Sequence, residues 1–472
     1  MHVQELKKFV FDWIEANKQE FHDISDQLFN HPELGMEEYE ASATLSALLE
    51  KHGFTVERGV ADMPTAFIAT YGQAGPVCGF NAEYDALPGL SQEAWNAIKT
   101  PVIEGAPGQG CGHNLIGVTA ILAAIATRYA LEQAGEQAIL KVFGTPAEEL
   151  CLGKAFMARA GCFNGVDFFI DWHPMFDHRA NYDHANAYFS LKYHFKGQSS
   201  HGNRPWYGRS ALDAAILMGH ALEMLREHYP PAPSVAGANT LNYTFSDVGP
   251  EFASVVPDHS TLWCVGRFYT TEELVEVMER VDKCAEAGAL ATGTTMEKEF
   301  ICATHEKIPN KVLAEVIHKN LSEIGPLPFT AEEQAFAKSL QRAAGVPEDG
   351  LQQEILPCEG GDTFVSDISE YSWHAPHAFF LIPLAPTCAW HNWMMVACAG
   401  GSLGKKNIDY GSKIIAASVL DVLAQPELIE KAKAELAKRL HGRTYSSLIP
   451  AEVDPPVAIN KATMDKYRPQ YK

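Results

Sequence analysis

The sequence has no Cys-x-x-Cys pair, no apolar run of membrane-spanning length and few basic residues. Its ten cysteines are scattered singly along 472 residues, a pattern that argues against a disulfide framework and favours a reducing compartment. No stretch approaches the ~18–20 apolar residues that a transmembrane helix needs. The charged N-terminal stretch 1–21 also lacks the apolar centre of a secretory signal. We therefore expect a cytoplasmic protein with no membrane partner.

The shortage of basic residues limits the class of ligand. There are 37 Lys and Arg against 59 Asp and Glu, which gives a formal net charge of −22. So acidic a chain is repelled by nucleic acid and by anionic membrane surfaces, which excludes both as expected partners. An anionic small molecule would need a local basic pocket.

The order of expected strands and helices divides the chain into three segments. Residues 1–186 begin with two helices and then alternate apolar strands with helices, which favours an α/β fold with a mainly parallel sheet. Residues 187–305 follow the order β-α-β-β-α-β of a ferredoxin-like α+β domain. Residues 306–472 return to helices and strands, so the middle segment is expected to be an insertion in one larger domain. The last 20 or so residues, rich in Pro and Lys, are expected to pack loosely.

Polar residues gather where the expected strands of the larger domain end. In an open α/β sheet, ligands bind in the crevice outside the carboxyl ends of the strands. The stretch GQGCGHNLIG (108–117) adds a cysteine and a histidine at the start of an apolar helix. The residues at these strand and helix ends are Glu83, Asp85, Cys111, His113, Glu148, Glu149, His173 and His391. Thiol, imidazole and carboxylate groups together suit Zn²⁺, Mn²⁺ or a related divalent ion.

Each of these residues alone also has an ordinary structural explanation. A single histidine is usually packed or on the surface, and Glu148 and Glu149 could belong to the first turn of a helix, where the dipole favours acidic residues. Adjacent carboxylates at a strand end, however, repel one another unless a cation intervenes. Their joint occurrence favours a metal site. One carboxylate of a pair could then bind an ion while the other takes a proton from water.

Seven short motifs follow one another along the chain: NHPELGMEE (30–38), EYDALPGLSQ (83–92), GCGHNLIG (110–117), GTPAEE (144–149), DWHP (171–174), SSHGNRPWYGRSALDAA (199–215) and HNW (391–393). In this order they resemble the motifs of the aminoacylase/carboxypeptidase-G type metallopeptidases. Within that family the chain is most similar to aminobenzoyl-glutamate hydrolases and their dipeptidase-like relatives. The resemblance implies a catalytic metal domain with an inserted lid-and-dimerisation domain.

The resemblance also implies roles for individual residues. Two divalent ions, Zn²⁺ or Mn²⁺ with Co²⁺ as an alternative, would be bound by Cys111, His113, Glu149, His173 and His391. Glu148 matches the general base, and Asp85, in the Asp-Ala-Leu-Pro motif near the metals, is expected to be a further catalytic residue. His201 matches a lid histidine that reaches across the dimer to stabilise the oxyanion, and Arg267 matches an arginine that holds the substrate carboxylate.

Three departures from the family pattern concern the substrate rather than the metals. Ser254 stands where the family usually has an asparagine that contacts substrate, and Trp206 is bulky where differently shaped residues are common. The stretch CEGGDTFVSDIS (358–369) has no clean counterpart, so no role is assigned to Asp362 or Asp367, nor to Glu83, which replaces a usual aspartate. Ser254 and Trp206, with Arg267, are the candidate substrate contacts.

The sequence thus predicts a metal-dependent amidohydrolase that cleaves an N-acyl amino acid, with p-aminobenzoyl-glutamate-like compounds or dipeptides as candidate substrates. The expected assembly is a homodimer or a heteromer with a related subunit. Two other functions remain open. One is a non-catalytic partner subunit, whose mark would be a missing ligand or base, and the other is hydrolytic deamination of an arylamine on the same scaffold.

Overall fold

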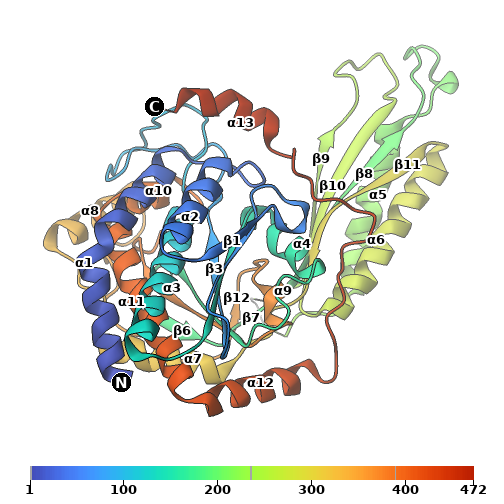
Figure 1. Cartoon of the computed structure of the whole chain (residues 1–472). Coiled ribbons are helices and arrows are strands. Elements are labelled where there is room, and N and C mark those ends of the chain that lie inside the picture. The colour runs from blue at the N-terminus through green and yellow to red at the C-terminus, as the bar shows by residue number, and fades with distance from the viewer. Residues whose placement is uncertain (1–2, 234–236, 389, 472) are drawn as a thin grey trace.

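The computed structural model describes residues 3–233, 237–388 and 390–471. A large α/β domain carries a smaller α+β domain that projects from one side (Figure 1). The projecting domain consists of residues between 187 and 304, and the chain returns from it to the large domain. The expected fold class, a metallopeptidase-like α/β domain with an inserted ferredoxin-like domain, is confirmed.

The large domain is built on a seven-stranded sheet with the order β1-β2-β4-β3-β5-β13-β6. Its strands are β1 Thr55–Arg58, β2 Phe67–Tyr71, β3 Val77–Glu83, β4 Ile139–Thr145, β5 Phe168–Met175, β6 Arg179–Asn181 and β13 His377–Pro383. The four central strands β4, β3, β5 and β13 are parallel, whereas β1, β2 and β6 pair antiparallel at the two edges. The expected parallel sheet is therefore its centre, and the edge strands make the whole sheet mixed.

Helices cover both faces of this sheet. One face packs on helices α1 Val3–Asn30, α3 His113–Ala134, α7 Lys311–Ile324 and α11 Ser402–Ala424. The other packs on α4 Gly153–Arg159 and α9 Ser369–Ser372. The alternation is visible in β5, where Phe168 belongs to the first core and Phe169 to the second. Further helices, α2 Tyr39–Lys51, α8 Ala331–Ala344, α10 Trp393–Ala399 and α12 Pro426–Leu440, lie around this core.

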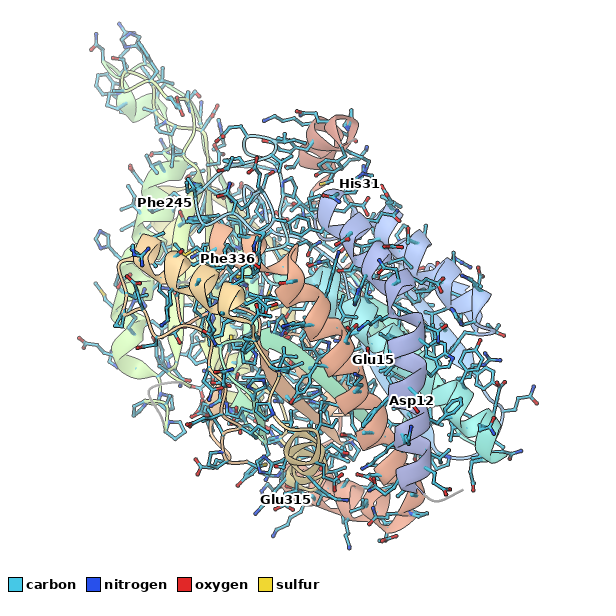
Figure 2. The ribbon with its side chains drawn as sticks, turned by 90° about the vertical axis from the view of Figure 1, so that its left-hand side faces the viewer. Asp12, Glu15, His31, Phe245, Glu315 and Phe336 are labelled. Atoms are coloured by element: carbon cyan, nitrogen blue, oxygen red, sulfur yellow. The ribbon has the colours of Figure 1, made fainter. Side chains whose placement is uncertain are left out.

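Helix α3 is apolar on nearly all sides because it is enclosed by protein. By length and composition it could cross a membrane, the single such helix in the described residues, contrary to the expectation that no stretch is that apolar. Most of it is buried, however, against α1, α11 and the strands β3 and β4. Figure 2 shows α1, which carries the labelled Asp12 and Glu15, running beside α11. Lys7 of α1 donates to Asp421 of α11 at 2.6 Å, which joins the two helices inside the protein.

The projecting domain has the strand order β11-β8-β10-β9, in which every neighbouring pair is antiparallel. Its elements are β8 Ala187–Lys196, α5 Ala211–Leu225, β9 Thr240–Asp247, β10 His259–Phe268, α6 Thr271–Thr292 and β11 Thr295–Thr304. The two helices cover one face of the sheet and enclose a separate apolar core. Phe245, labelled in Figure 2, belongs to β9, the edge strand of this sheet. We call the β8–β11 unit the lid.

The C-terminal segment is well packed, so the expectation of a loose tail is wrong. Helix α13, Lys461–Tyr467, buries Met464 and Tyr467 against the large domain. Tyr471 donates from its hydroxyl to the carbonyl of Pro32 at 2.8 Å, and Arg468 donates to the carbonyl of Glu37 at 2.7 Å. The Pro- and Lys-rich C-terminal segment is therefore ordered and packed on the large domain.

Candidate metal centre

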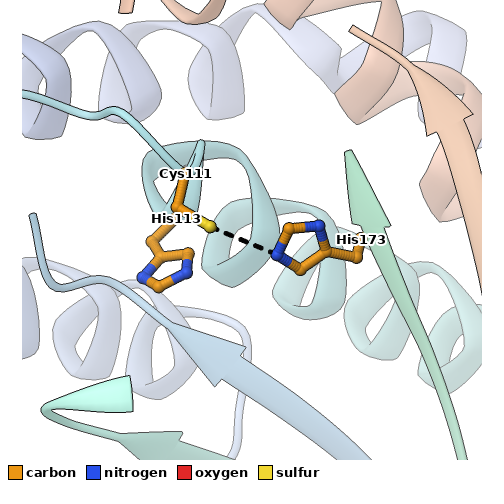
Figure 3. Close-up of side chains that lie close together, drawn as sticks. All are labelled: Cys111, His113 and His173. Atoms are coloured by element: carbon orange, nitrogen blue, oxygen red, sulfur yellow. Dashed lines mark hydrogen bonds between the residues drawn. The ribbon is translucent and has the colours of Figure 1, made fainter. Parts of the chain in front are cut away.

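Cys111 and His113 are placed by a tight turn that opens helix α3. Gly112 between them adopts a left-handed conformation with φ 78°, and the helix begins at His113. A side chain would be strained at that φ, and its Cβ would lie 2.9 Å from Pro174, so glycine is required there. The turn directs the Cys111 Sγ toward His173 of β5, with 3.3 Å between Sγ and Nε2 (Figure 3).

The structure brings the five expected ligands together as two sets that share one thiol. Cys111, His113 and His173 offer ligand atoms that all lie within 4.8 Å of one another, and so do Cys111, Glu149 and His391. These residues come from the ends of β4 and β5, the start of α3 and the loop after β13. A sulfur common to two three-atom sets is the arrangement that would bridge two neighbouring ions.

Two buried polar atoms among these ligands have no hydrogen-bond partner among the described residues. They are Nε2 of His113, which is fully buried, and Oε1 of Glu149. An unpaired buried polar atom is costly, and each such atom needs an explanation such as an ion. Both atoms belong to the sets that surround Cys111. The donor set and its unpaired atoms therefore fit divalent cations.

The electrostatics of the cluster indicate a shortage of positive charge. Burial, followed by repulsion from Glu83, raises the pKa of Glu148, and burial raises the pKa of Glu149 well above its usual value. Burial and the Glu149 carboxylate also raise the pKa of the Cys111 thiol. A divalent ion bound beside these groups would favour their ionised forms and offset the effect of burial.

The pKa values of the two histidines of the first set are shifted in opposite directions. Burial lowers the pKa of His173 to about 4. Burial also opposes protonation of His113, but Cys111 and Asp85 outweigh it and raise its pKa. A neutral His173 has a lone pair available for a metal, and its Nδ1 lies 2.7 Å from the carbonyl of Pro174. That contact assigns the proton to Nδ1 and leaves Nε2 free to bind.

Asp85 contacts two of the ligands and does not line the cavity. Its Oδ1 lies 2.9 Å from Nδ1 of His113, and its Oδ2 accepts the backbone N–H of Glu149 at 3.0 Å. A carboxylate behind a metal-binding histidine fixes the orientation of the ring. The structure thus assigns Asp85 to orienting His113 and the Glu149 backbone.

The turn that carries Glu148 and Glu149 is strained and supported from behind. Ala147 has φ 56°, an uncommon value for a residue with a side chain. Its N–H donates to Oε1 of Glu38 at 2.8 Å, and Gly35 leaves no room for a Cβ, which would lie 2.9 Å from Ala147. The NHPELGMEE motif therefore acts as the support for the acidic turn. Strain of this kind is concentrated at functional sites.

A cavity of about 510 Å³ opens above the ligand sets, a volume in the range of small-molecule sites. The large domain contributes Cys111, Glu148, Glu149, His173 and His391 to it, and the lid contributes Tyr188 and Arg267. The guanidinium of Arg267 lies over the Tyr188 ring, 5.4 Å from its centre. Phe364 and Trp390 flank His173, with ring centres 5.4 and 5.9 Å away. The cavity thus combines acidic and imidazole groups, one guanidinium and an aromatic wall.

Three expected site residues lie away from this cavity in the single chain. His201 is exposed, and its Nδ1 accepts the backbone N–H of Asn203 at 3.0 Å. The Trp206 side chain is 65% exposed, and Ser254 meets the same loop through its carbonyl, which accepts the Gly202 N–H at 2.7 Å. All three lie on lid loops around a second concavity formed by neighbours such as Gly202, Pro205 and Val255.

Sequence reasoning missed a buried lysine beside the acidic cluster. Nζ of Lys154, in α4, is 2.8 Å from Glu83 and 2.6 Å from Asp367, and all three residues are buried. Ser366, next to Asp367, donates to Glu148 at 2.6 Å. The one signal in the sequence was a lysine in the otherwise apolar stretch CLGKAFMA (151–158).

Comparisons with known proteins agree with this geometry. A family model described as a peptidase dimerisation domain matches residues 186–292. One of the two p-aminobenzoyl-glutamate hydrolase subunits of Escherichia coli K12 is 34% identical, over 96% of this chain and 99% of its own length. A mouse Xaa-Arg dipeptidase is 28% identical, over 92% of this chain and 93% of its own length.

Solved structures share the fold. A dinuclear metal-binding peptidase of the M20 family from Bacillus subtilis superposes with a TM-score of 0.55 at 17% identity. The match covers 87% of this chain and 99% of that one. At such low identity the likeness concerns the architecture of the large domain and lid.

Proposed function

This chain belongs to the M20 peptidase family of hydrolytic enzymes, and from that premise we propose that it cleaves the amide bond of an N-acyl amino acid or a dipeptide. The observation that carries the proposal is the pair of ligand sets sharing Cys111, with unpaired atoms on His113 and Glu149 among the described residues. These residues would hold two divalent ions, for which Zn²⁺ and Mn²⁺ are the first candidates and Co²⁺ the next.

In this proposal the two neighbouring glutamates have separate tasks. Glu149 binds an ion, whereas Glu148 accepts a proton from the attacking water and returns it to the leaving amine. Two ions, when bound, would supply Lewis-acid activation of water and of the amide carbonyl. Oε2 of Glu148 lies 3.7 Å from Nε2 of His113, and together with Glu83 these two residues form a third set of neighbouring ligand atoms beside the two sets that share Cys111.

Arg267 supplies the positive charge that an anionic substrate needs. In a chain of net charge −22, it is the one Arg or Lys among the described residues that line the cavity. We propose that its guanidinium binds the carboxylate of the amino-acid half in a bidentate manner. Phe364 and Trp390 form an apolar wall beside His173 that suits an aryl acyl group. A p-aminobenzoyl-glutamate-like substrate meets both requirements.

The exposed lid residues are proposed to act on a second subunit. His201 would donate to the developing oxyanion of a neighbouring site, with Ser254 and Trp206 contributing substrate contacts there. The partner would be an identical chain or a related one, since the Escherichia coli relative described above is itself named as one subunit of a hydrolase. The domain limits we adopt for this arrangement are 1–186 and 306–472 for catalysis and 187–305 for the lid.

A complementation experiment tests whether His201 of one subunit acts at the metal site of the other. His201→Ala and Glu148→Ala chains, inactive alone, are co-expressed with different tags and the hybrid is purified. With random pairing, half the dimers are hybrids with one intact site, so the unfractionated mixture should regain about a quarter of wild-type activity and the purified hybrid about half. Hybrids as inactive as either parent would contradict a role for His201 at the neighbouring subunit's site.

The substrate class is tested by a panel with one metal at a time. Purified protein, loaded with Zn²⁺, Mn²⁺ or Co²⁺, is offered aryl-acyl glutamates, alkyl-acyl glutamates, dipeptides and an arylamine without an acyl-amino-acid bond. Release of the free amino acid from the aryl-acyl series supports the proposal, whereas ammonia release from the arylamine would favour deamination. Inactivity on every member would favour a non-catalytic role, although all expected ligands and the expected base are present.

We also propose a cytoplasmic location, consistent with ten free thiols.

A further inference from the structure

We propose that Ser366 is a positioning residue for Glu148, and that the Lys154–Asp367 ion pair holds Ser366 in place. The inference rests on the proposed role of Glu148 as general base. It assigns a role to the loop between β12, Asp362–Thr363, and α9, for which the sequence suggested none. This loop carries Phe364 at the cavity wall and Ser366 at the base.

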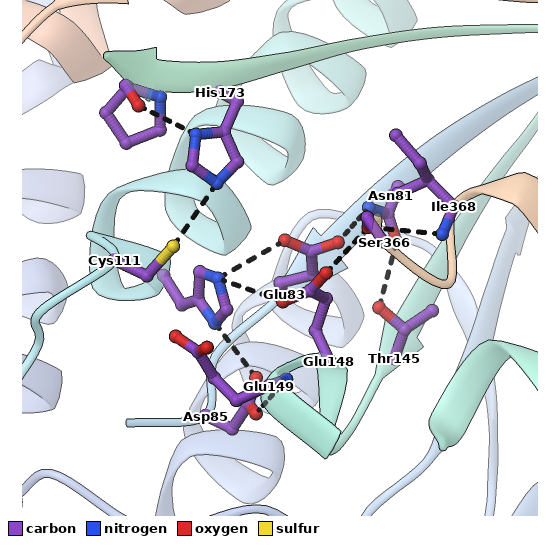
Figure 4. A network of polar contacts seen from close by, with 12 residues as sticks. Asn81, Glu83, Asp85, Cys111, Thr145, Glu148, Glu149, His173, Ser366 and Ile368 are labelled. Atoms are coloured by element: carbon purple, nitrogen blue, oxygen red, sulfur yellow. Dashed lines mark hydrogen bonds and ion pairs between the residues drawn. The ribbon is translucent and has the colours of Figure 1, made fainter. Parts of the chain in front are cut away.

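The hydrogen bonds of Ser366 fix the direction of its proton. Its hydroxyl accepts the backbone N–H of Ile368 at 3.3 Å and lies 2.6 Å from Oε1 of Glu148 (Figure 4). The hydroxyl donates a hydrogen bond to Glu148, which accepts it through Oε1. Oε1 is thereby held, and the other oxygen, Oε2, is the one that faces the ligand sets near His113. Ser366 therefore selects which oxygen is free to take a proton.

Asp367 attaches this loop to helix α4 at two points. Its Oδ1 accepts from Nζ of Lys154 at 2.6 Å, and its Oδ2 accepts the backbone N–H of the same residue at 2.9 Å. Both residues are fully buried. A two-point, charge-assisted contact restrains rotation as well as distance. Within the described part of the chain, residues 364–367 belong to no strand, so side-chain contacts such as this one help to fix their position.

Lys154 also connects the loop to the end of strand β3. Its Nζ lies 2.8 Å from Oε1 of Glu83, which in turn accepts from Asn81 at 2.9 Å. One ammonium is thus shared by carboxylates from β3 and from the loop, beside the Glu148 carboxylate. Buried ion pairs of this kind contribute more to a defined geometry than to net stability in some proteins. Here the geometry so defined is that of the base.

The main test compares two buried serines three residues apart. Ser366→Ala should lower kcat by about tenfold to a hundredfold, as expected when a carboxylate loses a short hydrogen bond, while KM and metal content stay near wild type. Ser369→Ala is the matched control, because its hydroxyl is equally buried but has no hydrogen-bond partner among the described residues. It should leave kcat unchanged. Ser366→Thr, which keeps the hydroxyl, should restore most of the activity.

Two further variants distinguish an error in the base assignment from an error in the positioning role. Asp367→Asn should lower kcat and also change KM, because the released loop carries Phe364. Glu148→Gln tests the base assignment itself: full activity in that variant would overturn the proposed mechanism, whatever Ser366 does. If Glu148→Gln is inactive but Ser366→Ala has wild-type kcat, the base stands and the positioning role is refuted. Equal losses in Ser366→Ala and Ser369→Ala, or loss of metal in Ser366→Ala, would also refute it.

Discussion

Replacing Lys154 by methionine should destabilise the large domain strongly. Methionine fills a similar volume but removes the ammonium that lies 2.8 Å from Glu83 and 2.6 Å from Asp367. Burial raises the pKa of Asp367, whereas the Lys154 ammonium lowers it. Without Lys154, two buried carboxylates therefore lose their cation and must either protonate or remain charged without compensation.

The magnitude follows from the burial of the three side chains. Lys154 and Asp367 have no exposed side-chain surface and Glu83 only 3%, so solvent screening is negligible. Breaking such a pair by removing one partner costs about 3–5 kcal/mol. At about 2 °C per kcal/mol for a large domain, the unfolding midpoint should fall by about 6–10 °C. The exposed pair Lys8–Asp12, with side chains 76% and 66% exposed, should contribute well under about 1 kcal/mol.

Calorimetry of Lys154→Met and of the control Lys8→Met, each with and without metal, measures the difference. Ions in the ligand sets would supply positive charge near Glu83 and Glu148, so the loss should be smaller in metal-loaded protein than after chelation. A midpoint for Lys154→Met within one degree of that for Lys8→Met would refute the reasoning. So would a loss that chelation leaves unchanged.

The remaining predictions concern the ligands, the base and one buried amine. Cys111→Ser should lose metal and activity while circular dichroism still shows a folded chain; wild-type metal content would mean that the thiol is only a core group. Glu148→Gln should keep its metal and lose about 10²–10⁴-fold in kcat, whereas Glu149→Gln should lower metal occupancy first, and the reverse pattern in elemental analysis would exchange the two roles. Burial lowers the pKa of Lys307 to about 7, below its unfolded value of about 10.4. The unfolded chain therefore binds more protons between these values, so this group's destabilising effect is complete below pH 7 and fades as the pH rises. Lys307→Met should accordingly raise the unfolding midpoint more at pH 6 than at pH 9, and an equal gain at both would contradict the lowered pKa.

Much of the site could be predicted because two independent signals coincided. The rule that ligands bind at the carboxyl ends of parallel strands selected Glu149 and His173, which are far apart in the sequence but lie in the Cys111 sets. The motif order supplied the family, and that resemblance was correct. The lid was predictable from periodicity alone, since β8 and β10 alternate buried and partly exposed residues over most of their length.

What the sequence did not predict lacks a periodic pattern. Strand β1 has four residues, of which Thr55, Glu57 and Arg58 are exposed, so no apolar alternation marks it. Lys154 looks like a surface residue of a short helix, because its burial depends on carboxylates 71 positions before it and 213 positions after it. Such a partnership is created by the tertiary fold and has no local signature.

Both the large domain and the lid line the cavity, so their relative position affects which substrates fit. The five ligand residues belong to the large domain, whereas Arg267 and Tyr188 belong to the lid. The distance between a scissile carbonyl at the ligand sets and a carboxylate at Arg267 therefore depends on how the lid sits on the large domain. Part of that orientation is held by Arg443, which lies 2.6 Å from Glu306 and 3.3 Å from Glu272 of the lid helix α6. Arg443, which follows helix α12, thus helps to set the spacing that the proposed substrate must span, although it does not line the cavity.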